Sequence, residues 1–182
     1  MPIYISMLRG INVGAHKRIK MEQLRTSFEG LGFEEVKTYI QSGNVIFKTA
    51  KVSEPVLTRR IEKKLLEDFG FPVSVISRTA NEMAKAVQNN PFLKGSGIDA
   101  EKLHVAFLSD VPAPSALQKC ETLTIAPDQA YCCGTELYLY LPSGVSGSSL
   151  MKSSLDRALG VITTMRNWRT VNAIHQMCVE CR

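Results

Sequence analysis

The sequence predicts an α+β fold made of two ferredoxin-like βαββαβ subdomains, a duplication, with an extra helix at the C-terminal end. Runs with the two-residue period of strands alternate with runs of helical period in the order β-α-β-β-α-β over residues 3–76. The same order returns over residues 103–163, as a repeat of pattern and not of residue identity. The expected division is residues 1–78 for the first subdomain, 79–101 for a helical linker, and 102–182 for the second subdomain with the C-terminal helix.

In the first half, β-branched and aromatic residues gather in four short runs, which predict strands at residues 3–8, 36–40, 45–47 and 73–76. Two helices between them are indicated by apolar side chains three or four residues apart: Met21, Leu24, Phe28 and Leu31, then Leu57, Ile61, Leu65 and Phe69. Ser53 suits the start of the second helix and Gly70 its end.

In the second half, the same criteria predict strands at residues 103–108, 131–133, 137–141 and 161–163. A short helix is expected over residues 114–121, and Met151, Leu155, Ala158 and Leu159 mark another. The last helix is indicated by Trp168, Val171, Ile174 and Cys178. Between the halves, residues 80–90 are predicted to be helical and residues 91–97 to form a linker.

Bulk composition bounds the class of protein. Of the 182 residues, 45% are hydrophobic, so the chain can bury a core, and its net charge of +5 is compatible with an acidic partner. Five cysteines form an odd set without the spacing of a disulfide framework, which favours reduced thiols in the cytoplasm. No apolar run reaches the roughly 20 residues that span a bilayer, so we expect no membrane partner.

The predicted topology brings two polar loops together. In a ferredoxin-like unit the exit of the first strand and the hairpin after the second share one edge of the sheet. We therefore expect one site formed by two groups of residues, and a site needs such convergence. The groups are Arg9, Gly10, Asn12 and Gly14 in the first loop, and Gln41, Ser42 and Asn44 in the hairpin.

The first of these loops could bind an anion, although its sequence matches no known nucleotide-binding motif. Amides of a glycine-rich turn can point at an anion, and the helix that follows adds a favourable dipole. His16, Lys17, Arg18 and Lys20 would add positive charge, but the spacing matches neither G-x-x-x-x-G-K-[ST] nor G-x-G-x-x-G. The alternative is a plain strand-to-helix turn in which the glycines supply positive φ.

A second candidate group follows the last predicted strand. Arg166, Asn167 and Trp168 place a guanidinium, a carboxamide and an indole in succession, which could bind an anion or stack on a planar ligand. Alternatively, Trp168 anchors the last helix in the core while Arg166 and Asn167 cap its start. The nearby loop over residues 142–149 has hydroxyls but no Lys or Arg, so a solvated connector is favoured over a phosphate site.

Other functions are less well supported. The third strand, residues 44–47, lacks the two exposed aromatic side chains of an RNA-recognition motif. Cys178 and Cys181 form a single C-x-x-C pair without a second pair at zinc spacing, so no metal is expected. We expect binding of a small anionic ligand, a nucleotide or phosphorylated metabolite. The alternative is a nucleic-acid-binding or protein-interaction module that uses the same basic edge. No motif indicates a reaction, a cofactor or an oligomeric state.

Several short motifs, in order along nearly the whole chain, resemble the bacterial domain-of-unknown-function 1697 family. They are L-R-G-I-N-V-G at 8–14, Met21 and Leu24, T-Y-I-Q-S-G-N-V at 38–45, L-P-S-G-V at 141–145, Leu159-Gly160, and T-M-R-N-W-R-T-V at 164–171.

The resemblance implies a cytosolic bacterial protein of duplicated ferredoxin-like architecture without an established activity. The polar motif residues of the family fall here on Arg9, Asn12, Gln41, Ser42, Asn44, Arg166, Asn167 and Trp168. Two departures stand out. Ala15 replaces a second glycine, which stiffens the turn, and residues 147–149 replace a basic pair, which weakens a phosphate role for that loop.

Overall fold

A computed structural model describes residues 1–181. Its internal contacts divide the chain into two compact units, each described by itself below. Unit 1 comprises Met1–Lys85 together with the segment that starts at Ala173, and unit 2 comprises Ala86–Asn172. The fold is α+β, with one four-stranded antiparallel sheet in each unit.

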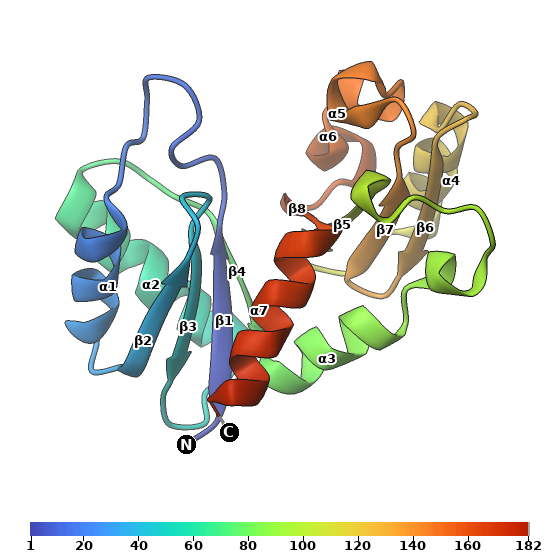
Figure 1. The fold of residues 1–182 in the computed structure, drawn as a ribbon. Coiled ribbons are helices and arrows are strands. Elements are labelled where there is room, and N and C mark those ends of the chain that lie inside the picture. Colours follow the sequence, from blue (N-terminus) through green and yellow to red (C-terminus); the bar gives the residue numbers. More distant parts are fainter. Residues whose placement is uncertain (182) are drawn as a thin grey trace. The chain divides into compact units, whose positions relative to one another are not determined.

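Unit 1 has a sheet with the strand order β2-β3-β1-β4 and two helices, α1 and α2, on one face of it (Figure 1). The helix α3 (Ala80–Gln88) begins directly after the last strand. The elements of the sheet and its helices are β1 (Ile3–Leu8), α1 (Met21–Glu29), β2 (Glu34–Tyr39), β3 (Asn44–Lys48), α2 (Glu54–Phe69) and β4 (Val75–Thr79).

Unit 2 has the strand order β6-β7-β5-β8. Its elements are β5 (Leu103–Leu108), α4 (Pro114–Leu123), β6 (Gln129–Cys133), β7 (Glu136–Tyr140), α5 (Gly144–Gly147), α6 (Leu155–Leu159) and β8 (Thr163–Asn167), with short 3-10 turns η1 (Pro91–Lys94), η2 (Ala100–Lys102) and η3 (Leu150–Lys152). The helix α7 (Trp168–Glu180) starts directly after β8. Leucines from β5, β7 and α6 form the core of unit 2.

The strands predicted at residues 3–8 and 103–108 are confirmed, but the last strand of each half was placed too early. β4 runs over Val75–Thr79 and β8 over Thr163–Asn167, instead of 73–76 and 161–163. The hydrophobic pattern ends early because both strands continue through buried polar residues, among them Arg78 and Arg166. Such residues stay in a strand when hydrogen bonds satisfy them.

The helix predicted over residues 151–159 is also interrupted. The structure has the turn η3 and then α6, with Ser153 and Ser154 between them. The Ser154 hydroxyl accepts a hydrogen bond from the Arg157 amide at 3.5 Å and caps α6. A serine at this position favours a cap over a helix interior, because its hydroxyl competes for backbone groups.

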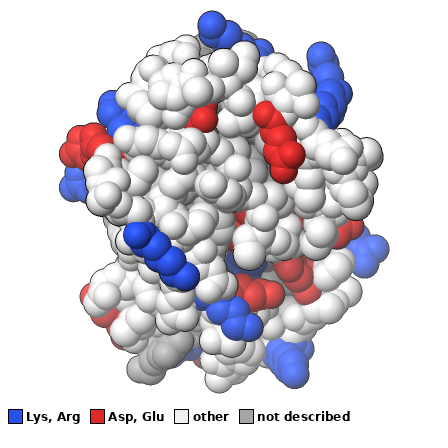
Figure 2. Space-filling model, turned by 90° about the vertical axis from the view of Figure 1, so that its right-hand side faces the viewer, with Lys and Arg blue, Asp and Glu red and all other residues white. Residues whose placement is uncertain are grey.

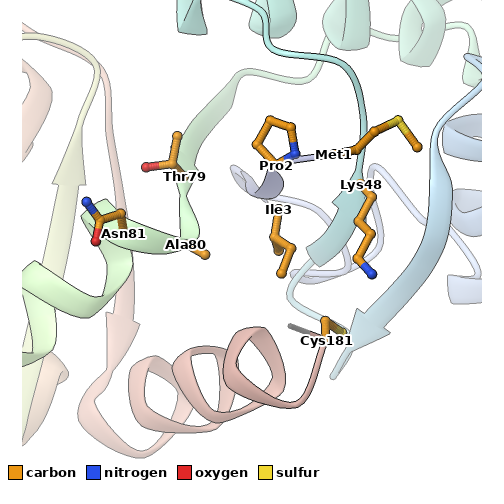
Figure 3. A pocket seen from close by; sticks show the side chains of 8 residues that line it. All are labelled: Met1, Pro2, Ile3, Lys48, Thr79, Ala80, Asn81 and Cys181. Atoms are coloured by element: carbon orange, nitrogen blue, oxygen red, sulfur yellow. The ribbon is translucent and has the colours of Figure 1, made fainter.

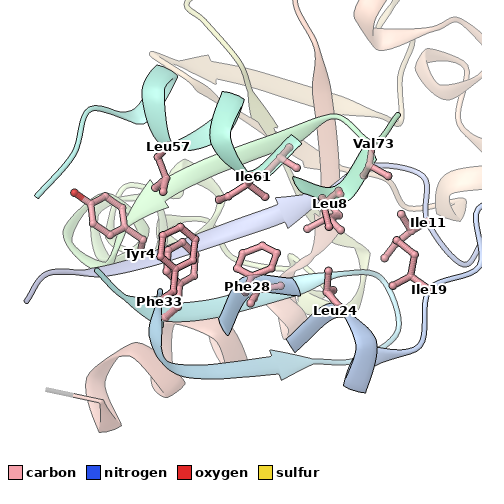
Figure 4. Close-up of a cluster of buried hydrophobic side chains, with 14 residues drawn as sticks. Tyr4, Leu8, Ile11, Ile19, Leu24, Phe28, Phe33, Leu57, Ile61 and Val73 are labelled. Carbon is pink, nitrogen blue, oxygen red and sulfur yellow. The ribbon is translucent and has the colours of Figure 1, made fainter. Parts of the chain in front are cut away.

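Aromatic packing dominates the core of unit 1, between the sheet and its two helices (Figure 4). Phe28 of α1 meets Phe47 of β3 edge to face with ring centroids 5.3 Å apart. Phe33 stacks on Phe47 at 4.5 Å. Such pairs add about 0.5–1.5 kcal/mol beyond the area that they bury. Tyr4 completes the group, and its hydroxyl donates to the Val52 carbonyl at 3.0 Å. This core fixes α1 on the sheet, and with it the loop that leads into α1.

Candidate functional site

The exit of β1 lies against the β2–β3 hairpin, as the predicted topology requires. The Leu8 amide donates to the Gly43 carbonyl at 2.8 Å, and the Arg9 amide donates to the Ser74 carbonyl at 2.9 Å. In Figure 1 the hairpin turn lies at the end of the sheet where β1 leads into its long loop. The predicted convergence of the two loops is therefore confirmed, and the start of β4 joins them.

Asn12 holds the first loop closed. Its Nδ2 donates to the carbonyls of Ile19 at 2.9 Å and of Gln41 at 2.8 Å, while its Oδ1 accepts from the Ile19 amide at 2.9 Å. Its own amide donates to the Lys17 carbonyl at 3.0 Å. Its φ of 56° lies in the left-handed region, which asparagine tolerates better than most residues. The Asn12 carboxamide thus links both ends of the loop to the hairpin.

The hairpin turn is shaped by Gly43 and Asn44. Asn44 is buried, and its Nδ2 donates to the Tyr39 carbonyl and to the half-buried Ser42 hydroxyl, both at 3.0 Å. Gly43 has a φ of +77°, and a Cβ there would lie 2.8 Å from Leu8 Cβ, which cannot move away as a side-chain end can, and 2.7 Å from Ile11 Cδ1. No side chain fits at that distance, so only glycine allows the first loop to pack on the hairpin.

A cavity of about 390 Å³ opens beside this junction. We call it the loop-edge cavity. It is lined by Asn12, Arg18, Ile19, Lys20, Met21, Gln23 and Gln41. Three of its features favour an anion. They are the exposed cations Arg18 and Lys20, the carboxamides of Gln23 and Gln41, which can donate hydrogen bonds, and the first turn of α1.

The start of α1 contributes backbone donors to the loop-edge cavity. Lys20 is the N-cap residue, and its side chain makes no capping hydrogen bond. The first intrahelical bond of this turn runs from the Leu24 amide to the Lys20 carbonyl at 3.0 Å. The amides of residues 21–23 precede it, so they have no acceptor within the helix. Such amides, with the helix dipole, favour a negative charge at this position.

The other predicted residues of unit 1 lie at the same junction with different exposure. Gly10 and Gly14 are exposed and have φ of +66° each, as predicted for glycines that turn the chain. Arg9 is exposed at the exit of β1 and lies outside the lining of the loop-edge cavity. Gln41 is exposed in the hairpin and lines the cavity. The loop is also held by Lys17, whose Nζ donates to the Pro72 carbonyl at 2.9 Å.

Arg166, Asn167 and Trp168 lie in unit 2, and Arg166 does not follow the last strand as predicted but lies inside β8. Its Nη1 donates to the Thr164 hydroxyl and the Met165 carbonyl, both at 2.9 Å, and burial lowers the pKa of its guanidinium to about 10. The Asn167 Oδ1 accepts from the Thr170 amide at 2.8 Å and caps α7. Trp168, 8% exposed, is a core residue. The alternative in which Trp168 anchors the last helix in the core and Asn167 caps its start is therefore correct for these two residues.

The segment predicted as a solvated connector, residues 142–149, contains the short helix α5. Hydrogen bonds to the buried Asp128 hold its C-terminal end in place. The Ser148 hydroxyl donates to the Asp128 Oδ2 at 2.6 Å, and the Ser149 amide donates to the same oxygen at 3.1 Å. Both Ser148 and Asp128 are buried. A carboxylate among these donors already supplies the negative charge that a phosphate would bring, so the segment does not favour an anion.

The sequence does not predict Gln23 as a site residue. It predicts Arg18 and Lys20 only as sources of additional positive charge near the first loop. The signal for the two cations is the basic stretch over residues 16–20 that precedes the helix. Gln23 has a weaker signal, its place in the first helical turn, where a polar side chain is ordinary.

Two broader findings concern residues 1–181. No group of three or more His, Cys, Asp or Glu side chains there could hold a metal ion. No helix in that range combines the length and the apolar character that crossing a membrane demands.

Comparison with known proteins gives a family and a fold. The model of the family described as protein of unknown function (DUF1697) matches residues 1–138. The search of curated proteins found no match. A solved structure with a similar fold is that of the conserved bacterial protein SP0830 from Streptococcus pneumoniae, with a TM-score of 0.73 and 23% identity. The similarity covers 97% of this chain and 98% of that one.

Proposed function

Because the chain belongs to DUF1697, a family whose description assigns no activity, we propose its function from the site itself. The loop-edge cavity binds a small anionic ligand, such as a nucleotide or a phosphorylated metabolite. The observation that carries this proposal is the meeting of Arg18 and Lys20 with the uncapped first turn of α1 in one cavity.

The donors of the cavity suit a phosphoryl group. An arginine guanidinium binds two phosphate oxygens at once, and a lysine ammonium adds a point charge. The amides at the start of α1 can donate to a third oxygen, with the helix dipole adding about half a positive charge. Gln23 and Gln41 can donate to the remainder of the ligand. The cavity volume of about 390 Å³ falls near the lower end of the roughly 300–1,000 Å³ of small-molecule sites.

The other predicted site residues then have supporting roles. Asn12 and Asn44 keep the loop and the hairpin in register, since their side-chain amides are used within the chain. Arg9, at the exit of β1, provides longer-range attraction for an anion. Arg166, Asn167 and Trp168 are not needed for this proposal, and their contact with a ligand stays a prediction.

The alternative is a nucleic-acid-binding or protein-interaction module on the same basic loop. The observation in its favour is the cluster of basic residues over residues 9–20. Proteins that follow a nucleic-acid backbone usually present a continuous basic stripe. The face drawn in Figure 2, which is the right-hand side of Figure 1, has basic and acidic side chains interspersed among neutral ones; the loop over residues 9–20 is not on that side.

A melting screen tests the proposal. We expect one class of phosphorylated small molecule to raise the melting temperature saturably, with a stabilisation of about 2.7 kcal/mol at a hundredfold excess over the dissociation constant. The double variant Arg18→Ala/Lys20→Ala is expected to lose most of this shift. The matched control Lys51→Ala/Lys63→Ala removes two exposed charges from unit 1 outside the cavity and should keep it.

Two results of that screen would contradict the proposal. Equal ligand shifts in both double variants would exclude the cavity. Length-dependent binding of oligonucleotides that weakens steeply with salt, without any small-molecule shift, would favour the alternative.

We also infer that the two units are ferredoxin-like subdomains that arose by duplication. The matching strand orders support this, and so do two buried arginines, each fourth in the last strand of its unit: Arg78 and Arg166. Along the chain, we propose residues 1–78 and 102–182 as the two repeats with 79–101 as linker, although the contacts group the segment from Ala173 with unit 1 and residues 86–101 with unit 2. The cytoplasm is the proposed location, because no disulfide joins the five cysteines, all of which lie within residues 1–181.

A further inference from the structure

The pair Cys178 and Cys181, to which the proposed function gives no role, lies beside a second cavity of unit 1. Both cysteines are buried, with 1% and 6% of their surface exposed. The cavity has a volume of about 360 Å³ and is lined by Met1, Pro2, Ile3, Lys48, Thr79, Ala80, Asn81 and Cys181. Figure 3 shows Cys181 at the end of α7 bordering this space, below Ile3 and Lys48 in that view. Cys181 is the residue of the pair that the cavity reaches.

A lysine contacts the sulfur of Cys181. The Lys37 Nζ donates to the Cys181 Sγ at 3.3 Å. Lys48 also lines the cavity, and its Nζ is 2.7 Å from the Glu35 carboxylate. The hydrogen bond from Lys48 lowers the pKa of that carboxyl, and the charges of Lys48 and Lys37 add to the effect. Two lysines therefore lie at this site: Lys37 contacts the Cys181 sulfur, and Lys48, paired with Glu35, lines the same cavity.

The spacing of the two cysteines allows a bond between them. Cys181 directly follows α7, and the helical hydrogen-bond pattern reaches its amide, which donates to the Met177 carbonyl at 3.2 Å. Residues three apart in a helix have Cα atoms about 5 Å apart, which lies inside the roughly 4.4–6.8 Å range of disulfides. Cys178 is therefore placed to react with a sulfur on Cys181.

We propose that Cys181 and Cys178 form a thiol–disulfide exchange site that accepts a small-molecule disulfide through this cavity. The Cys181 thiolate attacks one sulfur of the disulfide, whose S–S bond breaks and releases one thiolate. Cys178 then loses its proton and attacks the Cys181 Sγ, which releases the second thiolate. The protein loses two hydrogens and two thiols form from the small molecule, so the protein is oxidised by the two electrons that the disulfide accepts. The site is independent of the loop-edge cavity.

The test treats the reduced protein with excess oxidised glutathione and follows each cysteine by peptide mapping. Cys133 is exposed and serves as an internal reference for an ordinary thiol. We expect a Cys178–Cys181 disulfide to form at least as fast as the modification of Cys133, although Cys181 is far less exposed. Cys178→Ser should stop at a mixed disulfide on Cys181, and Cys181→Ser should leave Cys178 reduced.

The role of the lysine is tested by the rate of the first step. Lys37→Met should slow it about fivefold to tenfold, the size of a single charge interaction near the surface, whereas Lys37→Arg keeps the cation and should stay near the native rate. Lys63→Met, on the outer surface of α2, is the matched control. The proposal is overturned if wild-type Cys178 and Cys181 stay reduced while Cys133 reacts. Equal rates for the two methionine variants would remove Lys37 from it.

Discussion

Gly43→Ala is expected to lower the free energy of unfolding by about 2–5 kcal/mol. An L-residue in the left-handed region costs about 1–2 kcal/mol, and Gly43 has a φ of +77°. The added Cβ would also lie 2.7 Å from Ile11 Cδ1 and 2.8 Å from Leu8 Cβ. Overpacking of this kind adds about 1–3 kcal/mol. Urea denaturation followed by circular dichroism measures the loss.

Gly10→Ala is the matched control for that experiment. Gly10 has a φ of +66°, but a Cβ added there would have no atom within 4 Å, so its variant should show only the conformational cost of about 1–2 kcal/mol. If both variants lose the same stability, the close packing of the first loop on the hairpin is wrong, and the candidate site loses its frame.

Phe28→Ala should destabilise the protein by about 3–5 kcal/mol, the usual cost of emptying a buried phenylalanine position. Phe28 is fully buried and contacts both Phe33 and Phe47 edge to face. The loss of its ring leaves a cavity that the sheet beneath cannot fill, because the neighbouring rings are fixed by their own stacking. The same denaturation experiment measures it.

The control for Phe28 is Leu66→Ala on the outer side of α2. Leu66 is 48% exposed, so its truncation should change stability by no more than about 0.5 kcal/mol. A small loss for Phe28→Ala, comparable with that of the control, would show that the aromatic cluster is not the core that holds α1 on its sheet.

The sequence predicts which loops of the candidate site lie together, because the order of strands and helices determines this. The order of strands and helices in the first half places Arg9 and Asn44 at one edge of the sheet, and the contact between Leu8 and Gly43 bears this out. The predicted bounds of β1 and β5 are also correct. These features follow from hydrophobic periodicity, which is a local property of the sequence.

The hydrogen-bond partners and the burial of individual side chains could not be predicted, because they depend on contacts between residues far apart in the sequence. The predicted ligand contact Asn12 bonds Ile19 and Gln41 through its side chain, which no local pattern indicates. Arg166 is predicted to follow the last strand, at residues 161–163, whereas the structure buries it inside β8 (Thr163–Asn167). The contact of Lys37 with Cys181 joins residues 144 positions apart.

The central claim, an anion site at the loop-edge cavity, is tested most directly by NMR titration of the ¹⁵N-labelled protein with inorganic phosphate and with a nucleoside monophosphate. An anion bound in this cavity should cause saturable shifts at the amides of Met21–Gln23 and at the side-chain amides of Gln23 and Gln41. The start of α2 also lacks a side-chain cap, so its amides at Glu54 and Val56 report on a bare helix N-terminus and should not saturate. Absence of saturable shifts at α1, or equal shifts at α1 and α2, would show that the loop-edge cavity is not an anion site.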